Sequence, residues 1–235
     1  MSNAILMASG MGTRMRPITD TKPKPLVEIN GVPLIETVID ALNHVAVENI
    51  YVVVGYLAEQ FQYLEAKYSN LQLIQNKDYS VANNISSLFY AAKHLEDNDC
   101  YICEADLYLP DKSILSPTPA ESCYYGCLVN GWSTDWVFEL DNGSHICRVG
   151  KGGADCYNMV GIAHFKQREA KLIAQKIKQC YALESYRDKF WDEVVDENLK
   201  ELQLIVNPIS HGKIIEIDTV EELEAVRSRY RPLTR

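Results

Sequence analysis

The stretch Ile5–Glu36, ILMASGMGTRMRPITDTKPKPLVEINGVPLIE, organises the rest of the chain. The apolar run Ala4–Ala8 at its start has the length of a buried strand. The segment Ser9–Arg14 follows, and its two glycines let the backbone turn tightly and approach a ligand closely. Four cations and one acid, Asp20, then lie within Arg14–Lys24. Together these features predict a polyphosphate site, because backbone N–H groups line an anion and basic side chains neutralise it.

Two familiar phosphate loops do not account for this stretch. No Gly-Lys-Ser/Thr follows at the spacing of a Walker A loop, and the third glycine of a dinucleotide fingerprint is missing. Taken alone, the two glycines would also fit an ordinary strand-to-helix turn with surface cations. Lys24 lies between Pro23 and Pro25, which restrict the local backbone and fix its direction. The alternative for Lys24 is a solvated surface lysine.

The stretch as a whole resembles the start of the sugar-phosphate nucleotidyltransferases. Their pattern is a glycine loop with Thr-Arg, a proline three residues later, then Pro-Lys-Pro-Leu-Val and Pro-Leu-Ile. This chain carries the pattern as Gly10, Gly12, Thr13, Arg14, Pro17, Pro23, Lys24, Pro25, Leu26, Val27, Pro33, Leu34 and Ile35. Ser9 departs from it slightly, because many relatives have a second alanine there.

The resemblance implies roles for the residues of this stretch. Lys24 would be the catalytic lysine that contacts the phosphates, and Arg14 would hold the β- and γ-phosphates. The loop residues implied to bind the nucleotide with them are Ala8, Ser9, Gly10, Gly12 and Thr13.

Length and composition bound the class of protein. The 235 residues, 47% of them apolar, fit one α/β domain, with a nucleotide-binding half at 1–110 and an acceptor-binding half at 111–235. The net charge of 23 − 32 = −9 argues against a nucleic-acid partner. No run approaches the roughly 18 apolar residues of a membrane span, and no signal peptide is evident, so we expect a cytoplasmic enzyme without membrane insertion. A homo-oligomer stays open.

Strand and helix patterns alternate through the first 110 residues, which predicts a parallel sheet with right-handed crossovers. The expected fold class is α/β, a Rossmann-like three-layer sandwich with a mostly parallel central sheet and a small inserted β region for the acceptor. Turn signals are read at 130–131, 141–143 and 150–153. Helices are expected at 33–45, 58–67, 81–95, 169–181, 188–198 and 220–230, and strands at 49–55, 71–74, 99–103, 123–129, 136–140, 159–164, 202–207 and 213–217.

Two pairs of acids are candidate metal ligands. Asp106 follows a predicted buried strand, and Glu216 and Asp218 stand two apart, on one face of another. The alternatives are a turn or cap at Asp106 and a helix N-cap at Asp218 or Thr219. The resemblance places the family's metal ligands at Asp106, which is also implied to be catalytic, and at Asp218, with Glu216 beside it. Mg²⁺ suits such a set, because it takes few protein ligands and prefers carboxylate oxygen.

The segment 79–88 is unusually polar for a helix start. Asn and Ser there are suited to reading a base or ribose, although capping alone would need only one of them. By resemblance, Asn84 and Ser87 face the nucleotide.

Aromatic residues near acids in the second half suggest the acceptor. The aromatic residues are Trp136, Tyr157, Phe190 and Trp191, and the acids are Asp135, Asp192 and Glu193. A quaternary ammonium is recognised by aromatic faces and a carboxylate, whereas core packing is the alternative for any single Trp.

Segments 133–136, 190–192 and 198–202, with Glu216–Asp218, resemble bacterial CTP:phosphocholine cytidylyltransferases in order and spacing. This implies CTP and phosphocholine as substrates, CDP-choline and pyrophosphate as products, and an acceptor site of Trp136, Trp191, Asp192 and Tyr157. The alternatives are a sugar-1-phosphate nucleotidyltransferase, cytidylyl transfer to phosphoethanolamine or aminoethylphosphonate, and a regulatory nucleotide-binding subunit without catalysis.

Overall fold

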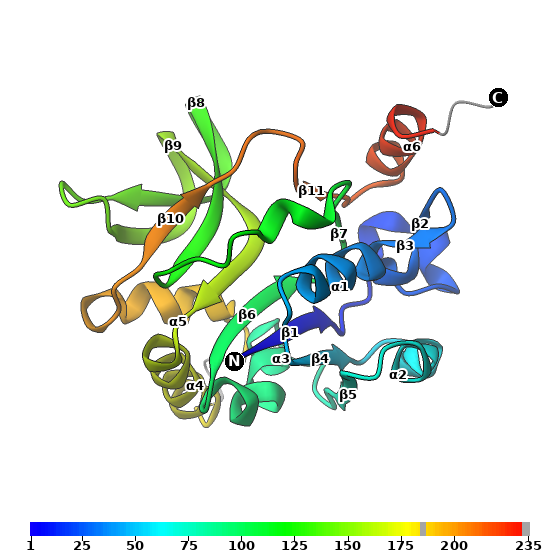
Figure 1. The fold of residues 1–235 in the computed structure, drawn as a ribbon, viewed down its shortest axis with the longest axis horizontal. Coiled ribbons are helices and arrows are strands. Elements are labelled where there is room, and N and C mark those ends of the chain that lie inside the picture. The colour runs from blue at the N-terminus through cyan, green and yellow to red at the C-terminus, as the bar shows by residue number, and fades with distance from the viewer. Residues whose placement is uncertain (184–186, 232–235) are drawn as a thin grey trace.

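The computed structural model describes residues 1–183 and 187–231, and its centre is a seven-stranded sheet (Figure 1). Strands β5, β4, β1 and β6 run parallel, β9 pairs with β6 in the antiparallel sense, and β8 and β10 follow. From one edge to the other the strands are β10 (Ile205–Pro208), β8 (Cys123–Leu140), β9 (Ile146–Phe165), β6 (Asp99–Glu104), β1 (Ser2–Ala8), β4 (Asn49–Val54) and β5 (Leu71–Gln75). This is the mostly parallel α/β sheet that the alternating pattern predicts.

Helices cover both faces of the sheet, and adjacent residues of β1 show why. Leu6 points into a core with Val38 of α1, whereas Ile5 points into a second core with Leu88 of α3 and Ile173 of α4. Side chains of a strand alternate between faces, so an entirely apolar β1 requires cover on both. The helices are α1 (Leu34–His44), α2 (Tyr63–Lys67), α3 (Ile85–Ala91), α4 (Gln167–Tyr181), α5 (Trp191–Glu197) and α6 (Val220–Arg229).

The C-terminal segment returns to the start of the chain. Strand β11 (Ile215–Glu216) pairs with β7 (Leu107–Tyr108), directly after β6. Helix α6 then lies beside the hairpin of β2 (Glu28–Ile29) and β3 (Val32–Pro33), as Figure 1 shows. A third apolar cluster joins them; its members include Met15, Val27, Leu34, Ile217 and Leu223. Short 3-10 turns occur at 13–15, 18–20, 24–26, 58–61, 92–95, 112–115 and 199–201.

Two of the turns expected in the second half are wrong. Residues 130–131 lie inside β8 and residues 150–153 inside β9, where the pairing register shifts at bulges. Gly131 has φ +84° and donates its N–H to Asp155, 2.7 Å away. The glycines therefore bend one long two-stranded ribbon instead of ending its strands. The turn at 141–143 is confirmed between β8 and β9.

The helix expected from Val81 begins only at Ile85. Asn83 before it donates its backbone N–H to the carbonyl of Arg187 at 2.7 Å and its side-chain amide to that of Asp188 at 3.0 Å. These long-range bonds hold residues 81–84 outside the helix. In the part of the chain that the structure describes, no helix is both long and apolar enough to cross a membrane.

Candidate active site

The predicted phosphate residues gather beyond the carboxyl ends of β1 and its neighbour β6. The glycine loop follows β1, and Asp106 follows β6. Chain order reverses at β1, since β4 and β5 lie on one side of it and β6 on the other. Such a switch point leaves a crevice where open α/β sheets bind ligands.

Gly12 shapes the loop. Its φ is +58°, and a Cβ built there would lie 2.9 Å from the Cβ of Lys24. Its carbonyl accepts a hydrogen bond from the Thr19 hydroxyl at 2.8 Å. Only glycine fits this conformation and this close approach without strain. The loop thereby forms one wall of a cavity of about 250 Å³ lined by Met7, Ala8, Gly10, Gly12, Thr13, Arg14, Lys24, Pro25, Asp106 and Asp218.

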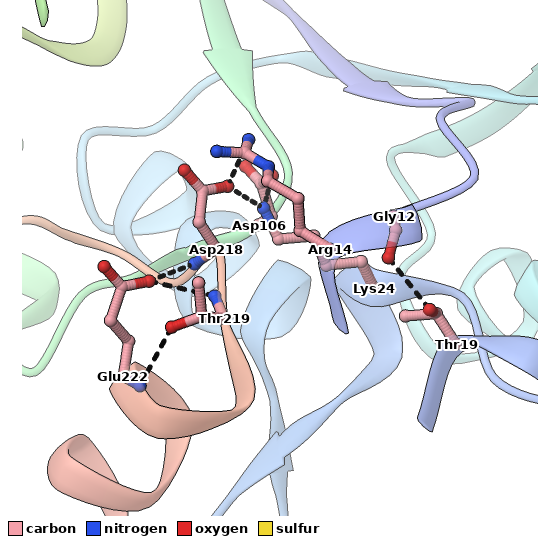
Figure 2. A network of polar contacts seen from close by, with 8 residues as sticks. All are labelled: Gly12, Arg14, Thr19, Lys24, Asp106, Asp218, Thr219 and Glu222. Atoms are coloured by element: carbon pink, nitrogen blue, oxygen red, sulfur yellow. Dashed lines mark hydrogen bonds and ion pairs between the residues drawn. The ribbon is translucent and has the colours of Figure 1, made fainter. Parts of the chain in front are cut away.

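Lys24 is buried, with 7% of its surface exposed, and points into this cavity. Its ammonium lies 2.5 Å from a carboxylate oxygen of Asp106 and 2.6 Å from one of Asp218 (Figure 2). Although burial acts to lower it, the neighbouring carboxylates raise the pKa of Lys24 above its ordinary value. The side chain is therefore a fixed, permanently charged cation at the wall of an anion-sized cavity.

Asp218 is positioned by the start of α6. Thr219 is the N-cap: its hydroxyl accepts the N–H of Glu222, and the Glu222 carboxylate accepts the N–H groups of Asp218 and Thr219 at 2.7 and 2.9 Å (Figure 2). Because Thr219 performs the capping, the Asp218 side chain is left to bind Lys24 and, at 2.7 Å, Arg14. Although partial burial works in the other direction, these cations lower the pKa of Asp218.

Asp106, Glu216 and Asp218 form a cluster whose oxygens lie within 4.8 Å of one another. Asp106 Oδ1 is buried and has no hydrogen-bond partner among the described residues. Enclosure in the cleft and the carboxylates of Asp106 and Asp218 raise the pKa of Glu216 to about 8. An orphaned carboxylate oxygen within a crowded acid cluster fits a hard divalent cation such as Mg²⁺.

A second cavity of about 290 Å³ adjoins the first and contains the polar segment before α3. The Ser9 hydroxyl lies 2.8 Å from that of Ser87, and the buried Asn76 amide donates to both hydroxyls, at 3.3 and 3.4 Å. Asn84 accepts the N–H of Trp191 at 3.0 Å. Asn84 and Ser87 thus line the cavity, as expected of nucleotide contacts, but each also has a structural bond. The polar lining also includes Tyr79, Asn83 and Ser86.

A third, larger cleft of about 580 Å³ extends from the acid cluster to the β8–β9 ribbon. Trp136 and Phe190 meet edge to face there, with ring centroids 5.3 Å apart. Asp192 accepts a hydrogen bond from the Tyr124 hydroxyl at 3.2 Å, and burial raises the pKa of Asp192 to about 7. This large cleft has aromatic faces and carboxylates together. It lies next to the 250 Å³ cavity of the glycine loop and Lys24, which we call the phosphate cavity.

Comparison with known proteins identifies the family to which the chain belongs. The MobA-like NTP transferase domain matches residues 4–127. The chain is 47% identical over 234 residues to the 2-aminoethylphosphonate cytidylyltransferase of Lancefieldella rimae, covering 100% of this chain and 95% of that protein. The chain belongs to the MobA-like NTP transferase family.

A sequence match and a solved structure, both from Streptococcus pneumoniae, agree with this membership. The choline-phosphate cytidylyltransferase of Streptococcus pneumoniae is 32% identical over 93% of this chain and 94% of that protein. A solved structure of the CTP:phosphocholine cytidylyltransferase from S. pneumoniae superimposes with a TM-score of 0.89 at 30% identity, covering 97% of this chain and 98% of that one. The chain is therefore a nucleotidyltransferase, and the relatives named above are cytidylyltransferases.

Two acceptor residues expected of this nucleotidyltransferase do not line the large cleft. Trp191 is 4% exposed and stacks on Tyr124, with ring centroids 5.7 Å apart. Tyr157 packs against the same apolar core. That both rings contact the acceptor therefore stays a prediction, whereas Trp136 and Asp192 are among the residues that line the large cleft.

Sequence reasoning gave no role to Glu104 and Lys151, both of which line the large cleft. Glu104 is two residues before Asp106, so strand alternation alone would have put both acids on one face. Gly161 leaves room for it, because a Cβ there would lie 2.9 Å from the Glu104 carboxylate. Lys151 carries no such signal, since its position depends on the pairing of β8 with β9.

Proposed function

We propose that this enzyme transfers the cytidylyl group of CTP to the phosphonate of 2-aminoethylphosphonate and releases pyrophosphate. The 47% identity to a 2-aminoethylphosphonate cytidylyltransferase over the whole of this chain carries the choice of substrates. It replaces phosphocholine, the acceptor expected from sequence, as the first candidate.

The reaction brings two anions together, so the residues of the phosphate cavity are proposed to cancel their repulsion. The glycine loop would line the triphosphate with backbone N–H groups, with Arg14 on its β- and γ-phosphates. Lys24 would contact the α-phosphate, where negative charge builds up in the transition state. Asp106 and Asp218, with Glu216 beside them, would hold Mg²⁺, which when bound neutralises phosphate charge.

The chemical step is proposed to be an in-line displacement. A phosphonate oxygen forms a new bond to the α-phosphorus, and the bond between that phosphorus and the bridging oxygen to the β-phosphorus breaks. Pyrophosphate leaves with the electron pair. The nucleophile is already an anion, so no side chain is needed as a general base. The buried ammonium of Lys24 supports this mechanism, since it supplies a fixed positive charge at the wall of the cavity.

The charges of the large cleft support an acceptor with a primary ammonium. Glu104 and Asp192 both line it, and Glu104 receives no hydrogen bond from any described residue. Burial and the nearby carboxylates of Asp106, Glu216 and Asp192 raise the pKa of Glu104, so this wall favours a bound cation. A primary ammonium has three N–H donors for such oxygens, whereas a trimethylammonium has none.

Phosphocholine remains the second candidate. The aromatic pair Trp136–Phe190 favours it, because ring faces attract a quaternary ammonium. A 32% identical relative is named for choline phosphate.

A pyrophosphate-release screen separates these possibilities. Each of the four NTPs is combined with 2-aminoethylphosphonate, phosphocholine, phosphoethanolamine and glucose 1-phosphate, with Mg²⁺ or with EDTA. We expect the highest kcat/KM for CTP with 2-aminoethylphosphonate and no turnover in EDTA. A higher kcat/KM for phosphocholine would overturn the acceptor, a preference for another NTP would overturn the donor, and full activity in EDTA would overturn the metal.

A further inference from the structure

The aromatic pair of the large cleft already holds a cation of the protein. Lys151 of β9 pairs with Trp136 of β8 in the strand register. Its ammonium lies 5.8 Å from the ring centroid of Trp136 and 5.4 Å from that of Phe190, within the range of a cation–π contact. Among residues 1–183 and 187–231, no carboxylate forms an ion pair with it.

The backbone at Lys151 and Gly152 is held by Arg148. The Arg148 guanidinium donates to the Lys151 carbonyl at 2.8 Å and to the Gly152 carbonyl at 3.1 Å, and pairs with Glu139 of β8 at 2.6 Å. These bonds fix the bulge from which the Lys151 side chain starts, so its reach to the two rings is a property of the folded ribbon.

A second cation bound by the same two rings would lie beside this ammonium. Like charges repel, so a trimethylammonium at the pair would compete with Lys151. A primary ammonium has another place to bind, because Glu104 and Asp192 line the same cleft and carry carboxylate oxygens to which it can donate. The two kinds of acceptor therefore differ in whether they compete with Lys151.

We propose that Lys151 is a specificity-determining residue, which fills the Trp136–Phe190 pair, excludes a quaternary ammonium and directs a primary ammonium to Glu104 and Asp192. This inference rests on the proposed function, whose acceptor cleft it deepens. Its chemical content is selection against phosphocholine by a charge that the protein itself supplies.

The test compares acceptors in the full-length Lys151→Met protein, with CTP and Mg²⁺ in excess. Emptying the aromatic pair should raise the ratio of kcat/KM for phosphocholine to that for 2-aminoethylphosphonate by about tenfold, mainly through KM for phosphocholine. Lys151→Arg keeps the cation and should leave the ratio near the wild-type value. Lys171→Met, on the exposed face of α4, is the matched control and should change nothing.

A ratio that stays within twofold in Lys151→Met, or that rises equally in Lys171→Met, would overturn the proposal. If the wild type turns over neither acceptor, the proposed function fails by itself, and titration calorimetry with phosphocholine still tests Lys151. Binding to Lys151→Met at least fivefold tighter than to the wild type would then support the filled pair, and equal binding would reject it. A wild type that prefers phosphocholine would contradict both proposals.

Discussion

Replacing Lys24 by Met tests the centre of the site, because this one side chain links three parts of the chain. Methionine keeps most of the length and apolar contact of the lysine stem but removes the ammonium. What is lost is the pair of contacts to Asp106 and Asp218, 2.5 and 2.6 Å long. Arg14 would remain on Asp218, whereas Asp106 would have no cation partner among the described residues.

The size of the effect follows from burial. The Lys24 side chain is 8% exposed and its partners 23% and 20%, so water can reach the two acids but hardly the lysine. Breaking a buried ion pair costs about 3–5 kcal/mol, and the partial access of water to both acids reduces this to about 2–3 kcal/mol without divalent ions. Loss of the same cation from the transition state should lower kcat by about 10²- to 10³-fold.

Urea unfolding in EDTA and in Mg²⁺, together with pyrophosphate release, measures both quantities. Lys22→Met is the matched control, because Lys22 pairs with Glu28 at 2.9 Å while both side chains are 42% exposed. Such a surface pair contributes about 0–1 kcal/mol. Mg²⁺ should restore part of the stability of Lys24→Met but not its turnover. The reasoning is refuted if Lys24→Met loses no more stability than Lys22→Met, or if its kcat stays within tenfold of the wild type.

Three further outcomes can be checked on the same protein. Asp106→Asn should raise the Mg²⁺ concentration for half-maximal activity at least tenfold and weaken Mn²⁺ binding in calorimetry, and unchanged values would remove Asp106 from the metal site. Because burial raises the pKa of Asp192 to about 7, its charge grows from pH 6 to 8, so the acceptor KM should fall over that window in the wild type relative to Asp192→Asn; parallel KM profiles would exclude the role. Burial lowers the pKa of His164 from 6.5 to about 4, so the unfolded chain binds the extra proton between these values and stability is lost as pH falls through them. The difference in free energy of unfolding between His164→Phe and the wild type should therefore be about 2 kcal/mol more favourable to the variant at pH 5 than at pH 7. Urea unfolding at both pH values measures it, and a difference that does not change with pH would contradict this.

The first half of the fold was predictable because its signals are local. The helix expected at 33–45 is found as α1 at Leu34–His44, and the strand expected at 49–55 as β4 at Asn49–Val54. In the second half, Gly131 and Gly152 were interpreted as turns, yet both lie in paired strands. A glycine with positive φ serves a turn or a bulge equally well, and only the distant partner strand decides which one forms.

In the site, too, the sequence pattern alone did not determine where individual side chains lie. Phe190 and Trp191 are neighbours in sequence, but Phe190 lines the large cleft while Trp191 is buried in the core. Phe190 is the N-cap of α5 and donates its N–H to Glu193 at 2.8 Å, so the change of backbone direction at the helix start sends the two rings apart. The sequence pattern indicated aromatic residues near an acid, whereas the helix boundary decided which ring reaches the cleft.

The division of the chain at residue 110 does not separate the phosphate cavity from the large cleft. The phosphate cavity takes Asp218 from the second half, and the large cleft takes Glu104 from the first. Asn84 lines both the polar cavity and the large cleft, and it accepts the N–H of Trp191 at the start of α5. Helix α5, which carries Asp192, is thus bound by the Asn84–Trp191 hydrogen bond to the wall of the 290 Å³ cavity before α3. Substitutions in the β8–β9 ribbon and at the start of α5, such as those at Lys151 and Phe190, can therefore change acceptor specificity alone only while the Asn84–Trp191 hydrogen bond is kept.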